Sequence, residues 1–163
     1  MRKPLYAMAS CALVLAATAA SAGPVDVSFV ESTRFSDAGT TRWDEEGNLK
    51  TLATHLQTLG QRYLAPGQTL KVEVLDVDLA GMSYPTSRGN IRVARGRADL
   101  PRITLRYSLQ GGDQVLRQGE ETVTDLDYMN HIRDASENES LRHEKRMLTQ
   151  WFQARFAPAR PRG

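Results

Sequence analysis

The feature that most constrains the fold is an alternating stretch, KVEVLDVDLAG, whose phase changes halfway along. Leu70, Val72 and Val74 alternate with polar residues, as in a strand with one buried face. Beyond them the apolar positions change parity and become Leu75, Val77 and Leu79. An extra residue at a β-bulge produces this change, and so does a strand that leaves one layer to pack against another. The stretch therefore predicts a long, half-buried strand with an irregularity inside it.

The first half of the chain predicts two further elements. Residues 25–30, VDVSFV, alternate like a strand, and a stripe of leucines that ends at Tyr63 has the spacing of an amphipathic helix. We expect Asn48 to be the N-cap of this helix. The polar residues between the strand and the helix predict a loop, which Phe35 and Trp43 anchor to the core.

The second half predicts a hairpin and a second helix. Ile91 and Val93 fit a short edge strand within a long connection. Residues 101–110 alternate regularly, and the GGD turn after them leads back into an antiparallel partner strand. We expect Ser140 to cap a final amphipathic helix that ends near Phe156.

In chain order these elements predict an α+β fold, β-α-β-(β)-β-β-α. We expect a mainly antiparallel sheet of four to five strands with two helices packed on one face. The opposite face would be partly open to solvent or to a partner. The fold occupies one domain, residues 23–157, and residues 158–163 form a disordered tail.

The N-terminus predicts export to the periplasm. Two basic residues precede an apolar run that is too short for a comfortable membrane span, and the run ends in the ASA pattern of signal peptidase sites. We therefore expect residues 1–22 to be a cleavable signal peptide and the mature chain to have no transmembrane segment. Cys11 is the single cysteine and lies within the signal, so the mature protein lacks thiol chemistry.

The charge balance argues against nucleic acid as a partner. The chain has 21 Lys and Arg against 19 Asp and Glu, and removal of Arg2 and Lys3 with the signal makes the balance even. A mature protein of zero net charge has no general attraction for nucleic acid or for an acidic membrane. Any electrostatic recognition must come from a local cluster.

Four segments together resemble a known family: GQTLKVEVLDVDLAG, PRITLRYSL, GEETVTDLDYM and LRHEKRMLTQWFQARF. They are similar to the domain-of-unknown-function family 3016, which consists of small exported proteins of Gram-negative bacteria. The resemblance extends over nearly the whole mature chain, from about Val25 to Phe156. It implies a periplasmic location, and it implies no catalytic residue, ligand or cofactor.

Asp76 and Asp78 are a weak candidate for a metal site. In a regular strand, side chains two residues apart point the same way, and with a third acid such as Asp99 these carboxylates could hold Ca²⁺ or Mg²⁺. The alternative is structural, with Asp78 accepting hydrogen bonds from the backbone of the following turn and Asp76 pairing with an arginine. We adopt the structural interpretation and expect no metal and no cofactor.

Arginines are dense between residues 88 and 106, and they are the leading candidate for a ligand-binding surface. Guanidinium groups bind phosphate or carboxylate through forked hydrogen bonds. In the envelope such a ligand would be an anionic lipid, a glycolipid or an acidic protein. The alternative is that the charges protect a sheet edge and pair with acids such as Glu73, Glu120 and Glu121. The candidates are Arg88, Arg92, Arg95, Arg97, Arg102 and Arg106.

Catalysis has little support in the sequence. No G-x-S-x-G turn, H-E-x-x-H helix, phosphate-binding loop or dinucleotide fingerprint occurs. In the first predicted helix, His55 lies at the border of the apolar stripe. In the second, His143 lies on a polar face. An acid-rich run matches no metal motif and fits a solvated loop. This run contains Asp125, Asp127, His131 and Asp134.

These observations favour a soluble periplasmic binding or accessory module without catalysis. Its partner would be an envelope protein or an anionic envelope molecule, recognised through the sheet face or the arginine-rich region. The alternative is a small metal-dependent or carboxylate-dependent hydrolase that uses Asp76 and Asp78. A third hypothesis is self-association through an exposed strand edge, and the oligomeric state is left open.

Overall fold

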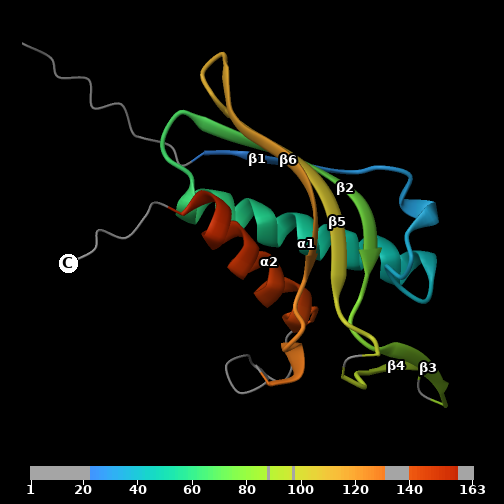
Figure 1. Ribbon diagram of the computed structural model, residues 1–163. Coiled ribbons are helices and arrows are strands. Elements are labelled where there is room, and N and C mark those ends of the chain that lie inside the picture. Colours follow the sequence, from blue (N-terminus) through green and yellow to red (C-terminus); the bar gives the residue numbers. More distant parts are fainter. Residues whose placement is uncertain (1–22, 88, 97, 131–139, 158–163) are drawn as a thin grey trace, which may run out of the picture.

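The computed structural model of the chain describes residues 23–87, 89–96, 98–130 and 140–157 (Figure 1). The predicted signal peptide and tail lie outside these residues, so both stay predictions. The described elements are β1 (Val25–Phe29), the 3-10 turn η1 (Ser32–Arg34), α1 (Arg42–Tyr63), β2 (Gln68–Asp78), β3 (Met82–Thr86), β4 (Gly89–Val93), β5 (Arg102–Gly111), β6 (Gln114–Thr124) and α2 (Arg142–Phe156).

Four of the strands form one mixed sheet in the order β1-β2-β5-β6. β1 lies parallel to β2, whereas β5 is antiparallel to both of its neighbours. The parallel pair depends on α1, because an intervening helix lets the chain re-enter the sheet in the same direction. The predicted α+β fold is confirmed, with a sheet that is mainly but not wholly antiparallel.

The irregularity predicted in the long strand is a β-bulge in β2. Val74 and Asp76 pair with consecutive residues of β5, so Leu75 is the extra residue. The bulge keeps Val77 fully buried and leaves Asp76 and Asp78 half-buried. Without the extra residue the apolar and acidic positions would exchange faces.

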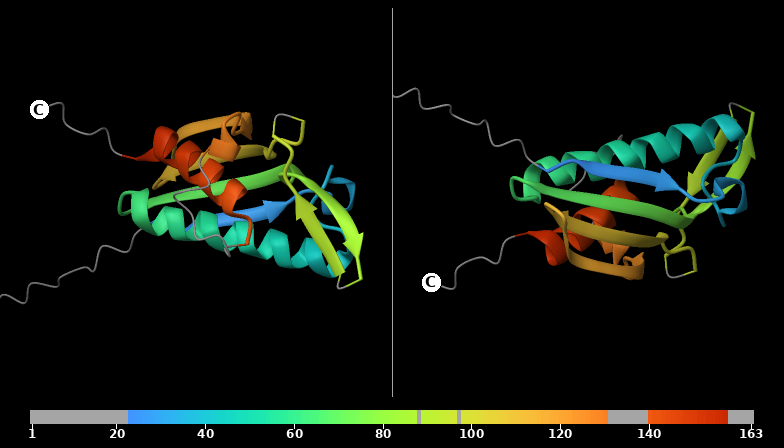
Figure 2. Two further views of the ribbon diagram at one scale, coloured as in Figure 1. Left: turned by 90° about the horizontal axis from the view of Figure 1, so that it is seen from below. Right: turned by 90° about the horizontal axis from the view of Figure 1, so that it is seen from above.

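Both helices cover the same face of the sheet, as predicted, and the core lies between them and the strands (Figure 2). The opposite face carries polar side chains along β2, β5 and β6. The largest fully buried core side chains include Leu52, Leu56, Leu70, Ile103, Leu105, Met147, Leu148 and Phe152.

α1 begins earlier than the sequence predicts. Its N-cap is Thr41, whose hydroxyl accepts a hydrogen bond from the Asp44 backbone N–H at 3.1 Å. Asn48, the predicted cap, lies inside the helix and donates its side-chain N–H to the Ala38 carbonyl at 2.9 Å. The capping prediction failed because the apolar stripe starts more than a turn after the helix does.

The two aromatic residues of the connection before the stripe behave differently. Phe35 packs against the core, with its ring centroid 6.4 Å from that of Phe29, as predicted. The prediction for Trp43 is wrong, because this side chain is 84% exposed. Trp43 lies in the first turn of α1, which extends beyond the core, rather than in a loop folded over it.

The N-cap of α2 also differs from the predicted one, by one residue. The N-cap position is Leu141 rather than Ser140, and its φ of 55° lies in the left-handed region. A left-handed backbone is uncommon for a residue with a Cβ, so packing must hold it. Leu141 packs against the core, which provides that support. Neither described helix is long and apolar enough to cross a lipid bilayer.

Candidate functional site

The β3–β4 hairpin projects from one end of the main sheet and carries the first part of the arginine-rich region (Figures 1 and 2). It contains the predicted strand at Ile91 and Val93, which pairs with β3 and does not join the main sheet. Gly81 permits the close approach at its base, because its φ is 78° and a Cβ there would lie 2.7 Å from the Val93 carbonyl oxygen. The sequence did not predict β3.

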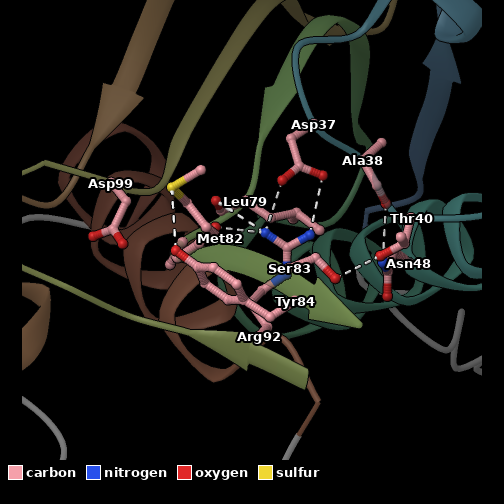
Figure 3. A network of polar contacts seen from close by, with 12 residues as sticks. Asp37, Ala38, Thr40, Asn48, Leu79, Met82, Ser83, Tyr84, Arg92 and Asp99 are labelled. Carbon is pink, nitrogen blue, oxygen red and sulfur yellow. Dashed lines mark hydrogen bonds and ion pairs between the residues drawn. The ribbon is translucent and has the colours of Figure 1, made fainter. Parts of the chain in front are cut away.

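Arg92 fastens this hairpin to the rest of the molecule (Figure 3). Its Nη1 and Nη2 donate to the two carboxylate oxygens of Asp37 at 2.8 and 3.0 Å, and Nη1 also donates to the Gly81 carbonyl at 2.7 Å. Beside this fork, the hydroxyls of Ser83 and Thr40 are hydrogen-bonded at 2.8 Å. The forked geometry predicted for a ligand is therefore filled by a carboxylate of the protein itself.

The loop that holds Asp37 is itself fixed to β2. The Asp37 backbone N–H donates to the Val77 carbonyl at 2.8 Å, and the Leu79 N–H donates to the Asp37 carbonyl at 3.0 Å. Arg92 therefore connects the hairpin to an extension of the main sheet. A charge-assisted, two-pronged contact of this kind resists both sliding and rotation of the hairpin.

Arg95 lies just beyond β4 and is exposed. Its guanidinium carbon is 5.0 Å from the centroid of the Tyr84 ring, in a cation–π arrangement. The Arg95 backbone N–H donates to the Asp99 carboxylate, which also accepts a hydrogen bond from the Tyr128 hydroxyl at 2.8 Å. Asp99 therefore closes the base of the hairpin and does not join Asp76 or Asp78 in an acidic cluster.

Arg102 and Arg106 lie elsewhere, on the open face of the main sheet. Arg106 contacts Glu73 on β2 and Glu120 on β6, at 3.0 and 2.9 Å. Arg102 lies 4.0 Å from Asp78. The groove along this face has a volume of about 410 Å³ and includes Arg106 with both of its acids. These cross-strand pairs correspond to the salt-bridge alternative that the sequence left open.

The described arginines thus divide between the hairpin and the sheet face. Arg88 and Arg97 lie outside the described residues, at positions that neighbour the hairpin in sequence. Of the candidates whose side chains are described, Arg95 is the one that combines exposure with a place on the hairpin.

Asp76 and Asp78 have structural partners, but not the predicted ones. The Asp76 carboxylate accepts hydrogen bonds from the Ser36 backbone N–H at 2.7 Å and from its hydroxyl at 2.9 Å. The arginine pairing expected of Asp76 is found at Asp78, whose pKa is raised by burial despite the opposing charge of Arg102. Within the described residues, no three His, Cys, Asp or Glu side chains converge as metal ligands would.

A buried acid that the sequence did not single out lies beneath the hairpin. Glu144 lies in the first turn of α2, and its carboxylate accepts a hydrogen bond from the Ala80 backbone N–H at 2.7 Å. Burial raises its pKa. A surface cavity of about 280 Å³ is lined by Glu144, Arg92 and His143 among others, and burial lowers the pKa of His143. An acid in a first helical turn resembles a capping residue, so no sequence signal marks this role.

The other histidine and the acid-rich run have local roles. His55 Nε2 lies 2.9 Å from both the Lys145 carbonyl and the Thr149 hydroxyl, so it joins α1 to α2. Asp125 accepts a hydrogen bond from the Asp127 backbone N–H at 3.0 Å. His131 and Asp134 lie outside the described residues.

Comparison with known proteins gives one match. The family model described as Protein of unknown function (DUF3016) matches residues 23–154. No curated protein and no solved structure shows a significant match. Because the family model extends over most of the chain, the protein belongs to the DUF3016 family of proteins of unknown function.

Proposed function

We propose that the protein is exported to the periplasm, where it loses residues 1–22 and acts without catalysis as a module that binds an anionic envelope molecule. The binding surface is the β3–β4 hairpin with the residues that flank it. The proposal combines the signal-like N-terminus with the charge of one segment. Residues 79–98 contain four arginines and no acidic residue, although the mature chain as a whole has an even charge balance.

The single observation that carries the proposal is the way this charge is distributed. The Asp37 carboxylate forms an ion pair with Arg92, which lies on the side of the hairpin that faces the body of the protein. Arg95 is exposed, and by sequence Arg88 and Arg97 belong to the same acid-free segment. The arginines of the sheet face differ, because Glu73, Glu120 and Asp78 accompany them. Among the described residues, the Arg95 guanidinium contacts the Tyr84 ring and no carboxylate, so an anion would meet exposed positive charge at the hairpin rather than in the sheet groove.

The proposal is tested by binding of the exported protein to phosphatidylglycerol vesicles and to purified lipopolysaccharide. Each arginine near an anionic surface contributes about 1 kcal/mol, so Arg95→Gln should weaken binding about fivefold. Arg62→Gln is the matched control, because Arg62 is also exposed but lies in the last turn of α1, outside the acid-free segment. Binding should also weaken as salt is raised, because exposed charges are screened.

Two results would overturn the proposal. One is the absence of salt-sensitive binding to either anionic preparation. The other is an equal effect of the Arg95 and Arg62 substitutions, which would remove the hairpin from the interaction. The mass of the protein recovered from the periplasm tests the export step, since cleavage after Ala22 leaves Gly23 as the first residue.

A further inference from the structure

The β3–β4 hairpin turns its polar face toward the protein and its apolar face toward solvent, the reverse of an ordinary surface hairpin. Strand pairing places Ser83 opposite Arg92 and Tyr84 opposite Ile91. Since side chains alternate along a strand, Ser83 and Arg92 share one face, and Tyr84 and Ile91 share the other. The polar face is turned toward the body of the protein, where it meets Thr40 and Asp37. The apolar face is therefore the outer one.

Four apolar or aromatic side chains that solvent reaches lie on the outer face. Met82 is 54% exposed, Ile91 52% and Val93 38%, and Tyr84 lies between them with intermediate exposure. An isolated two-stranded hairpin is marginally stable in water and normally gains stability by burying its apolar face. Here polar contacts hold the hairpin instead, and its apolar face is left free to contact another apolar surface or a lipid bilayer.

The charge around this face identifies the contacted surface as an anionic bilayer. The segment from Leu79 to Ala98 has no acid, and Arg95 lies over the Tyr84 ring at the rim of the apolar face. Arginine is attracted to anionic headgroups, and tyrosine favours the level of the headgroups because its ring is apolar and its hydroxyl polar. A purely apolar partner surface would not require the exclusion of acids from the segment.

An exposed tryptophan lies at the same end of the molecule. The Thr40 hydroxyl is hydrogen-bonded to Ser83 of the hairpin, and Trp43 follows Thr40 by three residues with 84% exposure. Tryptophan, like tyrosine, is enriched where protein meets the membrane–water interface. Asp44 and Glu45 follow Trp43 in the first turn of α1, so we assign the anion contact to the hairpin alone.

We infer that the β3–β4 hairpin inserts its outer face into the headgroup region of an anionic lipid bilayer, with Met82, Ile91 and Val93 entering and Arg95 contacting phosphate. This inference rests on the proposed function and specifies both its ligand and its mode of contact. Inserted amphipathic elements reach about 5–10 Å into the boundary between headgroups and acyl chains.

The absence of cysteine from residues 23–163 allows a direct test on the exported protein. Ile91→Cys and Val115→Cys place a polarity-sensitive fluorophore at positions of matched exposure, 52% and 54%. Val115 lies next to the β5–β6 turn, at the opposite end of the sheet from the hairpin (Figure 1). With vesicles of phosphatidylglycerol and phosphatidylcholine, we expect a blue shift and protection from an aqueous quencher at position 91 alone.

A second pair of variants measures the energetic contribution of the apolar face. Met82→Ser with Ile91→Ser should lower partitioning onto the same vesicles tenfold or more, on the order expected for removing two exposed apolar side chains from a buried contact. Val115→Ser with Leu116→Ser is the control, because these residues are 54% and 51% exposed at the other end of the molecule. This control should bind as the unmodified protein does.

The outcomes separate this inference from the proposed function. Arg95-dependent binding that the Met82 and Ile91 substitutions do not change would overturn insertion and leave anion binding intact. So would binding to lipopolysaccharide without binding to phosphatidylglycerol vesicles. Equal binding to vesicles of phosphatidylcholine alone would overturn the requirement for an anionic surface. Absence of binding to every anionic preparation would overturn both proposals.

Discussion

The surroundings of Glu144 and Glu121 shift the pKa values of these two glutamates in opposite directions. Glu144 is enclosed at the start of α2, and burial raises its pKa. Burial opposes ionisation of Glu121 as well, but hydrogen bonds from Arg155, Tyr107 and Trp151 outweigh it and lower the pKa. The folded state therefore favours the protonated form of Glu144 and the ionised form of Glu121.

The difference in free energy of unfolding between the Glu144→Gln variant and the unmodified protein should shift in favour of the variant as pH rises. With a folded-state pKa above 4.5, the native protein loses stability between pH 4.5 and that higher pKa, since the unfolded chain releases the proton first. Glutamine keeps an oxygen to accept from the Ala80 N–H but does not ionise. Urea unfolding across pH 4 to 8 measures the difference. A difference that is constant with pH would contradict the assignment, because Arg92, Asp37 and His143 nearby are common to both proteins.

Glu121→Gln should show the opposite trend. The native carboxylate accepts from the Tyr107 hydroxyl at 3.0 Å and from Trp151 Nε1 at 3.1 Å, and pairs with Arg155 at 3.0 Å. We expect the substitution to cost about 1–3 kcal/mol at neutral pH, as for hydrogen bonds to a charged group. Because the folded pKa lies below 4.5, this cost should shrink as pH falls below that value. A cost that persists unchanged at acid pH would show that the charge is not involved.

At the scale of elements, the hairpin depends on one contact between segments distant in sequence. Arg92→Lys keeps the charge but removes the fork to Asp37, so we expect a loss of about 1–3 kcal/mol in hairpin anchoring. Hydrogen exchange should accelerate in β3 and β4 and stay slow in β2 and β5, which are held by the core. Arg106→Lys is the control for loss of an arginine fork on the sheet face. Uniform acceleration through the main sheet would show that the contact supports the whole fold.

The elements that the sequence predicts best are those that bury a regular apolar pattern. β2 with its bulge, β5 and the stripe of α1 all have this property. The start of α1 was missed because the turns before its apolar stripe touch little of the core. β3 was missed because a polar fork and a hydroxyl contact, not burial, hold it in place. Periodicity carries no information about contacts of that kind.

At the scale of the whole molecule, proximity in sequence does not bring all the candidate arginines together in space. The arginines from Arg88 to Arg106 form one dense run in the sequence, but the fold sends Arg92 and Arg95 to the hairpin and Arg106 to the sheet face. The partners that distinguish them, Asp37, Glu73 and Glu120, come from other elements. Charge compensation depends on pairing across strands, so it became visible only in three dimensions.

The place of β1 at the edge of the sheet has a consequence for the proposed cleavage after Ala22. Gly23 is packed so closely before this strand that a Cβ would lie 2.3 Å from the Gln68 carbonyl oxygen. A protease that trimmed the N-terminus a few residues too far would remove Val25 and strip the cover from one side of β2. An uncovered strand of that length recruits other strands, so imprecise processing would yield aggregates rather than a slightly shorter protein.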